Sequence, residues 1–198
     1  MKKALLLILL FVSIAGSAQK AEYDVVNDFL EVELSKKDYD TIFVIEQPLQ
    51  KTKSIQMYKE AFKQKDVSNA SSEKQIWVYP ETIFWPWDEK NVDEIEIKLQ
   101  KENDKPWTNK DFKNQNFIFY PEKIVRSRDF IISNISANKY VFNLSRPLLN
   151  KNKDFAIFQF YPSFLVGGGS SANDGLILME KKGDKWIQVA VMQYAVYN

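Results

Sequence analysis

Cysteine and histidine are both absent from this 198-residue sequence. Without cysteine, the chain forms no disulfides, and its hydrophobic core alone must stabilise it. Ser-His-Asp and Cys-His nucleophile arrangements are excluded, as are zinc sites of the usual His/Cys type. Carboxylate chemistry, a lysine- or tyrosine-assisted mechanism and a metal site with oxygen ligands remain open. Because the sequence also lacks the Asp-x-Asp-x-Asp-Gly pattern of a calcium-binding loop, we expect no metal site.

An excess of charge of one sign is also missing, since 27 Lys and Arg residues balance 26 Asp and Glu residues. A near-neutral chain creates no global field that would attract nucleic acid, so we expect no nucleic-acid partner. Glycine is scarce, and the only glycine-dense loop runs from Gly167 to Gly175. This loop has no lysine in the position that a phosphate-binding loop requires, and a strand pattern follows it instead of a helix. We therefore expect a flexible connection there, and no cofactor.

The N-terminus has the three parts of a secretory signal peptide. A basic start at Met1–Lys3 precedes an apolar run from Ala4 to Ile14, and small residues follow at Gly16–Ala18. This order predicts a signal peptide over residues 1–18. A transmembrane anchor is the alternative, but about 11 apolar residues cannot cross a bilayer that requires ~20. We therefore expect residues 19–198 to form a single soluble domain with no membrane span, exported to the periplasm or the extracellular space.

The C-terminal third holds the longest apolar strand patterns. These run over Phe155–Val166, Leu176–Glu180 and Trp186–Tyr197, and the Lys-Gly-Asp-Lys sequence at Lys182–Lys185 predicts a tight hairpin between the last two. The chain has 14 Phe, 9 Tyr and 5 Trp residues, which is ample material for a core. We expect these strands to form a β-meander that is the stable centre of the domain.

Shorter patterns predict the remaining elements. Helices are expected over residues 22–36, 54–65 and 90–101. Further strands are expected at Thr41–Glu46, Gln75–Tyr79, Phe117–Tyr120, Phe130–Ile135 and Tyr140–Leu144. The polar segment 66–74 is the most plausible internal linker. In the third helix, Ile95, Ile97 and Leu99 also alternate as a strand would, so a strand is the alternative there. The predicted class is α+β, with the helices packed on an antiparallel sheet built from the C-terminal half.

Two elements have faces that can be predicted residue by residue. In the first helix, Val25, Val26, Phe29 and Val32 are expected to face the core, and Asp24, Asp28 and Glu31 to face solvent. In the last strand, Ile187, Val189 and Val191 are expected to share one buried face. The second helix has Ser54 as its expected N-cap.

Tyr-Pro dipeptides recur at a constant spacing. Tyr79-Pro80, Tyr120-Pro121 and Tyr161-Pro162 each follow an apolar run. A true repeat would indicate stacked supersecondary units. The segments between the dipeptides differ in hydrophobic pattern, so we favour coincidence among aromatic strand ends.

The candidate ligand-binding residues are Trp85, Trp87, Asp88 and Glu89. Two tryptophans flanking Pro86 could form an exposed platform for a sugar ring, with the two acids accepting hydrogen bonds from hydroxyl groups. The alternative is that the rings pack into the core, as large aromatic side chains usually do. The acidic segment from Asp88 to Glu96 also contains enough carboxylates for a glycosidase pair, although a helix N-terminus attracts acids for electrostatic reasons.

These observations predict a non-enzymatic, exported binding or interaction domain with no catalytic residue, whose partner is a glycan or a cell-envelope protein. A carbohydrate-active hydrolase that uses carboxylates near Trp85 and Trp87 is the alternative. Catalysis requires two carboxyl groups facing each other across a cleft at ~5–10 Å, whereas binding requires only exposed aromatic and polar groups.

Overall fold

The computed structural model describes residues 20–36, 39, 41–65, 75–100, 104–113, 116–135, 139–165 and 175–195. The strands are β1 (Thr41–Ile45), β2 (Ile76–Tyr79), β3 (Phe117–Tyr120), β4 (Lys139–Leu144), β5 (Leu148–Leu149), β6 (Phe155–Phe164), β7 (Gly175–Lys182) and β8 (Lys185–Tyr194). The helices are the N-terminal helix at residues 20–35, α2 (Lys51–Gln64), α3 (Glu89–Leu99), α4 (Glu122–Val125) and α5 (Arg128–Ser133), with a 3-10 turn, η1, at Asn109–Asp111. The signal-peptide prediction, the linker at 66–74 and most of the glycine-dense loop fall outside the described residues.

The described strands form one 8-stranded sheet in the order β2-β8-β7-β6-β4-β1-β3, with β5 paired to β6 off this path. The predicted C-terminal meander is confirmed, since β6, β7 and β8 are successive antiparallel neighbours. Gly183 occupies the tight turn between β7 and β8 with a φ of 64°, a left-handed conformation that glycine adopts without strain. The α+β class is therefore correct, and α3 is a helix and not a strand.

The sheet is mixed, which corrects the expectation of an antiparallel sheet. β1 runs parallel to both β3 and β4, which lie on its two sides. The predicted strand at Phe130–Ile135 is also wrong, because most of it belongs to α5. These two errors have one cause. Because β3 and β4 are both parallel to β1, the chain needs a long crossover between them, and α4 and α5 provide it.

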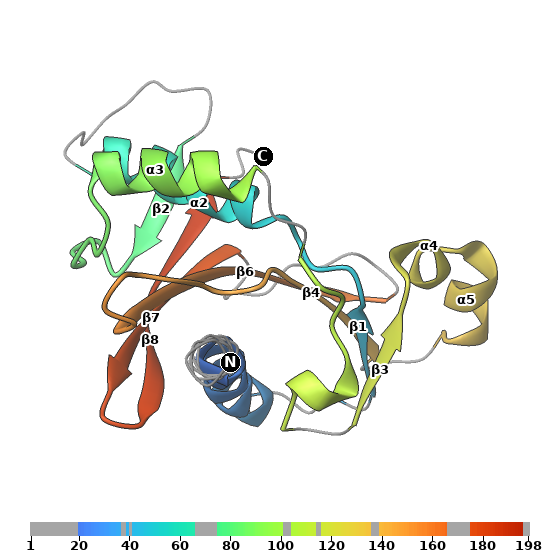
Figure 1. Ribbon diagram of the computed structural model, residues 1–198. Helices are drawn as coiled ribbons and strands as arrows, with labels where there is room; N and C mark the ends of the chain where they lie inside the picture. The colour runs from blue at the N-terminus through green and yellow to red at the C-terminus, as the bar shows by residue number, and fades with distance from the viewer. Residues whose placement is uncertain are drawn as a thin grey trace, which may run out of the picture.

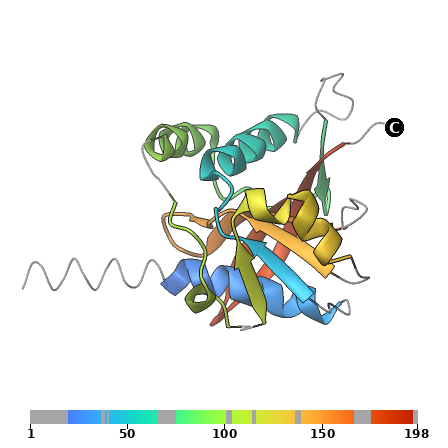
Figure 2. The same cartoon turned by 90° about the vertical axis from the view of Figure 1, so that its right-hand side faces the viewer.

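Helices cover both faces of the sheet. Figure 1 shows the N-terminal helix on one side of the sheet and α2 with α3 on the other, and Figure 2 shows the same order of layers from the side. α4 and α5 lie on the same face as α2, because Val125 clusters with Phe43, Val141 and other residues that point away from the N-terminal helix. Among the described helices, none is long and apolar enough to span a membrane.

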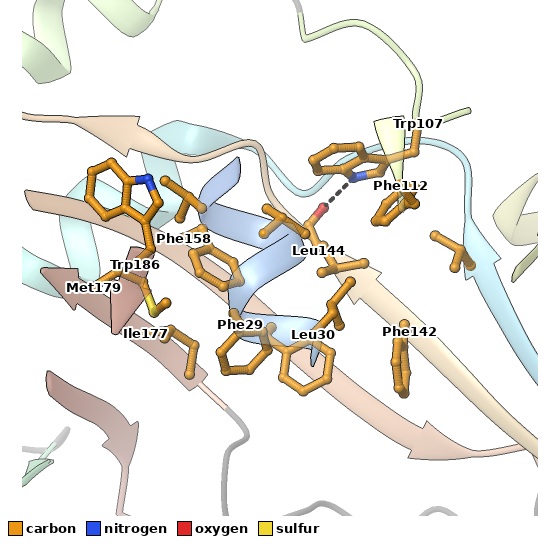
Figure 3. Close-up of a cluster of buried hydrophobic side chains, with 14 of the residues drawn as sticks. Phe29, Leu30, Trp107, Phe112, Phe142, Leu144, Phe158, Ile177, Met179 and Trp186 are labelled. Carbon is orange, nitrogen blue, oxygen red and sulfur yellow. Dashed lines mark hydrogen bonds between the residues drawn. The ribbon is translucent and has the colours of Figure 1, made fainter. Parts of the chain in front are cut away.

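The core beneath the N-terminal helix is aromatic (Figure 3). Phe29 packs edge-on against Phe158 and Phe160, with ring centroids 5.2 and 5.0 Å apart. Trp107 closes the far end of this cluster, and its indole N–H donates to the Leu144 carbonyl over 3.2 Å. Each edge-on aromatic pair contributes about 0.5–1.5 kcal/mol in addition to the stabilisation from apolar burial.

The predicted face of the N-terminal helix is only partly correct. Val25, Val26 and Phe29 are buried, but Val32 is 56% exposed. Asp28 was expected in solvent and is instead 5% exposed. Its carboxylate accepts the backbone N–H of Trp186 at 2.9 Å and lies 3.3 and 3.4 Å from two lysine ammonium groups. The helix is therefore attached to the β7–β8 hairpin through a paired buried charge.

A β-bulge in β8 overturns the predicted face of the last strand. The pairing register with β7 shifts between Leu178 and Met179. As a result, Trp186 and Val191 both belong to the cluster beneath the N-terminal helix, although five positions separate them in sequence and regular alternation would place them on opposite faces. Ile187, expected to be buried beside Val191, is 46% exposed.

Two further expectations can be compared with the structure. α2 begins at Lys51, so Ser54 is not its N-cap; it is buried, and its hydroxyl donates to that of Ser145 over 3.2 Å. The Tyr-Pro dipeptides have different surroundings, since Tyr79 and Tyr120 end the two edge strands whereas Tyr161 lies within β6. Their spacing therefore does not mark a common structural unit.

Candidate functional site

Trp87, one of the two tryptophans considered for a sugar-binding platform, is a core residue with 3% exposure. Tyr58 of α2 holds the Trp87 backbone through both of its polar groups. The Tyr58 hydroxyl donates to the Trp87 carbonyl at 3.1 Å and accepts the Trp87 N–H at 3.2 Å. The two rings also meet edge-on, with centroids 5.3 Å apart. Burial raises the pKa of Tyr58 above its ordinary value, so the hydroxyl keeps its proton for this bond.

Trp85 is half-buried and packs edge-on against α2. Its ring centroid lies 5.4 Å from that of Tyr58 and 5.5 Å from that of Phe62. The Trp-Pro-Trp segment therefore packs its rings against α2, which is the alternative that the sequence left open. Phe84 is the aromatic residue of this segment that faces solvent, with 68% exposure.

The acids that follow Trp87 are largely engaged in attaching α3. Asp88 is the N-cap of the helix and accepts the Asn91 N–H at 2.8 Å. Glu89 lies 3.7 Å from Lys63. Lys59 of α2 lies 2.6 Å from Asp93 and 3.3 Å from Glu96.

Glu96 also accepts a hydrogen bond from Gln56 of α2 at 2.9 Å. The hydrogen bonds from Gln56 and then Lys59 hold the pKa of Glu96 below its usual value. Hydrogen bonds to Asp93 and Glu96 in turn raise the pKa of Lys59. The Glu96 carboxylate thus remains ionised near neutral pH, and it attaches α3 to α2.

A cavity of ≈ 540 Å³ lies beside Trp87, between α3 and the turn that joins β5 to β6. Its apolar wall consists of Pro86, Trp87, Ile95 and Leu149. Its polar rim consists of Asn91, Glu94, Lys98, Lys151 and Asn152. Of the four ligand-binding residues predicted from the sequence, only Trp87 lines the cavity, whereas Trp85, Asp88 and Glu89 lie outside its lining.

The turn between β5 and β6 is held by its own hydrogen bonds. The side-chain oxygen of Asn150 accepts the backbone N–H groups of Asp154 and Phe155, both at 3.1 Å. The Asn150 amide also donates to the Asp154 carboxylate at 2.6 Å. Asn150 is therefore used by the turn itself, and this leaves the exposed side chains of Lys151 and Asn152 at the cavity rim.

Two features of the cavity bear on its chemistry. The indole N–H of Trp87 is buried and has no hydrogen-bond partner among the described residues, although a buried tryptophan N–H usually has one. Glu94 is the one carboxylate among the residues that line the cavity.

The sequence did not predict the polar residues at the rim of the cavity. The available signal was the polar Asn150–Asn152 segment, whose proximity to α3 depends on the tertiary fold.

Two smaller cavities lie elsewhere among the described residues. One, of ≈ 450 Å³, is mostly apolar and lies between Phe84, Phe155 and Val189. The other, of ≈ 370 Å³, lies at the start of α2, where Lys51 pairs with Asp104 at 3.1 Å. Within the described ranges, no three His, Cys, Asp or Glu side chains gather as a metal site would require.

Comparison of the chain with models of protein families, with characterised proteins and with solved structures finds no match. Its function therefore has to follow from its own geometry and chemistry. The cavity beside Trp87 combines the greatest volume of the three described above with an apolar wall and a rim of hydrogen-bond donors and acceptors. It is the strongest candidate site.

Proposed function

We propose that this chain is an exported, non-enzymatic binding domain, and that the cavity beside Trp87 holds a sugar ring of a glycan. The observation that carries this proposal is the pairing of an apolar wall with a rim that both donates and accepts hydrogen bonds. A sugar ring has the complementary surface, since its C–H groups form apolar patches and each hydroxyl donates one hydrogen bond and accepts others. Export itself rests on the leader at residues 1–18.

Size and polarity agree with this assignment. Small-ligand cavities in proteins are usually about 300–1,000 Å³ and combine apolar walls with a few polar groups, and this cavity has a volume of ≈ 540 Å³. Its rim offers amides at Asn91 and Asn152, a carboxylate at Glu94, and ammonium groups at Lys98 and Lys151. These groups suit several hydroxyls around one ring better than they suit a single charged group.

The unpaired indole N–H of Trp87 adds a second argument. A buried donor without a partner costs about 1–3 kcal/mol. Trp87 forms part of the cavity wall, so a small rotation that brings its N–H to a ligand hydroxyl oxygen would recover this energy on binding. Trp87 would thereby contribute a hydrogen-bond donor to the ligand in place of the stacking surface that the sequence left as one possibility.

Binding without hydrolysis is supported by the distribution of the carboxylates. A glycosidase requires two carboxyl groups that face each other at ~5–10 Å, and Glu94 is the one carboxylate in the cavity lining. Asp88 caps α3, while Glu89, Asp93 and Glu96 pair with lysines on α2. Using any of these acids at the cavity would require breaking the attachment of α3.

The test is isothermal titration of the full secreted chain with a panel of neutral mono- and disaccharides. Glu94→Gln should weaken binding of the best sugar about tenfold, because it replaces a hydrogen bond to a charged group, which contributes about 1.5–3 kcal/mol, with a neutral one that contributes about 0.5–1.5 kcal/mol. Glu122→Gln on α4 is the matched control and should leave the affinity unchanged. Absence of saturable binding, or equal effects of the two variants, would contradict the proposal. Hydrolysis that Glu94→Gln abolishes would favour the hydrolase instead.

A further inference from the structure

A second group of polar side chains lies on the sheet, away from the cavity beside Trp87. Asn143 of β4 pairs across the sheet with Tyr161 of β6. Gln159 lies two residues before Tyr161, and Ser145 directly follows β4, where its N–H donates to the Gln159 carbonyl at 3.0 Å. Because side chains alternate along a strand, these four share one face. Their neighbours Phe142, Leu144, Phe158 and Phe160 point into the cluster under the N-terminal helix.

This polar strip separates two apolar clusters on the same face. One cluster lies beneath α2 and α3 and includes Ile157 and Leu176, and the other lies beneath α4 and α5 and includes Val141. Figure 1 shows β4 and β6 between these two groups of helices. Asn143 and Tyr161 are half-buried, which agrees with a position between the helices and not beneath them.

Two buried oxygen atoms in the strip have no hydrogen-bond partner among the described residues: Oδ1 of Asn143 and Oε1 of Gln159. Gln159 is only 5% exposed. Its amide nitrogen donates to the Tyr161 hydroxyl at 3.3 Å. Exchanging the amide nitrogen and oxygen of Gln159 would leave its nitrogen unpaired instead, so one polar atom of Gln159 lacks a partner in either orientation.

The neighbouring Ser145 hydroxyl has hydrogen-bond partners, unlike the side-chain oxygens of Asn143 and Gln159. The Ser145 hydroxyl accepts the backbone N–H of Gln159 at 2.8 Å and the Ser54 hydroxyl at 3.2 Å. Buried polar atoms are normally paired, and an unpaired one is destabilising. Asn143 and Gln159 therefore leave hydrogen-bonding capacity that a ligand could use.

We propose that Asn143 and Gln159 form a binding site for a secondary amide, the group found in peptide bonds and in N-acetylated sugars. The four side chains of the strip are uncharged, and a charged ligand group buried there would lack a partner of opposite charge. Both unpaired atoms are acceptors, and a secondary amide supplies the N–H donor that they lack, in the N–H···O bond that amides form with one another. This site shares no lining residue with the cavity beside Trp87, so it stands independently of the proposed sugar site.

The test uses ¹⁵N-labelled full chain and the side-chain NH₂ signals of Asn143 and Gln159 in NMR spectra. The probe is N-methylacetamide, and the matched control is N,N-dimethylacetamide, which has no N–H. We expect saturable shifts of both signals with N-methylacetamide and at least fivefold weaker binding of the control. Equal shifts with both compounds, or no saturation, would overturn the proposal. So would a crystal structure at saturating probe in which only a water contacts the two oxygens.

Amino-acid substitutions distinguish probe binding at Asn143 and Gln159 from probe binding in the cavity beside Trp87. Gln159→Met keeps the length of the side chain, removes the unpaired oxygen and should weaken N-methylacetamide binding at least tenfold, whereas Gln188→Met on β8 should not. If Gln159→Met does not fold, Asn143→Leu provides the same comparison. Persistence of binding in the folded variant would overturn the proposal, as would a probe that shifts the Asn91 signals instead. N-acetylglycinamide and N-acetylglucosamine then distinguish a peptide source of the amide from a sugar source, and binding of either one supports the site.

Discussion

Replacing Val191 with aspartate tests both the position of the core and the bulge in β8. Val191 is 5% exposed, and its strand neighbours are Tyr79 on β2 and Ile177 on β7. Val191→Asp removes about 1.5–3 kcal/mol of apolar burial. It also buries a carboxylate with no partner, which costs several kcal/mol more. The expected loss is therefore at least ~4 kcal/mol out of a total stability of about 5–15 kcal/mol.

Ile187→Asp on the same strand is the matched control. Ile187 is 46% exposed, so the new carboxylate remains hydrated. Its cross-strand neighbour is Glu180, and two like charges in this position cost about 1 kcal/mol or less. The bulge therefore predicts a large difference between two substitutions that regular strand alternation would treat as equivalent.

Urea unfolding followed by tryptophan fluorescence measures this difference. With a slope of about 2 kcal/mol/M, a loss of ~4 kcal/mol lowers the unfolding midpoint by about 2 M, or leaves the variant unfolded without urea. Ile187→Asp also loses the buried half of the isoleucine side chain, about 1 kcal/mol, so together with the like-charge cost it should lower the midpoint by no more than about 1 M. Equal shifts for the two variants would refute the bulge, and an unchanged midpoint for Val191→Asp would refute the assignment of its face to the core.

Two further predictions concern the N-terminus and alkaline pH. N-terminal sequencing of protein from the native host should begin at Gln19, and a sequence that begins at Met1 would contradict the signal peptide. Burial and the nearby Glu60 carboxylate raise the pKa of Tyr194 to about 12. Because the folded state then binds the phenolic proton more tightly than the unfolded chain does, this stabilisation is complete below pH ~10 and is lost as pH rises towards 12. The free energy of unfolding should fall over that interval, and Tyr194→Phe should make the fall smaller.

Strands that consist of one uninterrupted apolar run were predictable, and so was a helix whose N-terminal residues are clearly marked. β1, β2 and β3 agree with the sequence to within one residue, because each is a short apolar run stopped by a proline or a polar segment. α3 was predictable because Asp88 precedes an amphipathic pattern and serves as its cap. In each case the information lies within a few neighbouring residues.

The errors arose where distant segments decide the local structure. Phe130–Ile135 has a strand-like composition, but Ser127 caps α5 by accepting the Phe130 N–H at 3.3 Å, and the chain must there cross between parallel strands. The bulge in β8 depends on the register that β7 imposes. The cavity beside Trp87 depends on the contact of α3 with a turn that lies far from it in sequence. Apart from the Ser127 cap, local patterns contain none of this information.

Buried polar residues show most clearly why the candidate sites could not be read from the sequence. Asp28 resembles any solvent-facing acid of an amphipathic helix, yet its burial is compensated by the Trp186 N–H and two ammonium groups. Asn143 and Gln159 stand in apolar strands, and their buried side-chain oxygens lack such compensation among the described residues. A buried polar group with its partners in place contributes to the fold. One that lacks a partner destabilises the folded chain, and a ligand that supplies the partner gains that free energy on binding. Only the three-dimensional arrangement of hydrogen-bond partners separates these two situations. It places Asp28 in the architecture, and it is the basis on which we propose Asn143 and Gln159 as a recognition site.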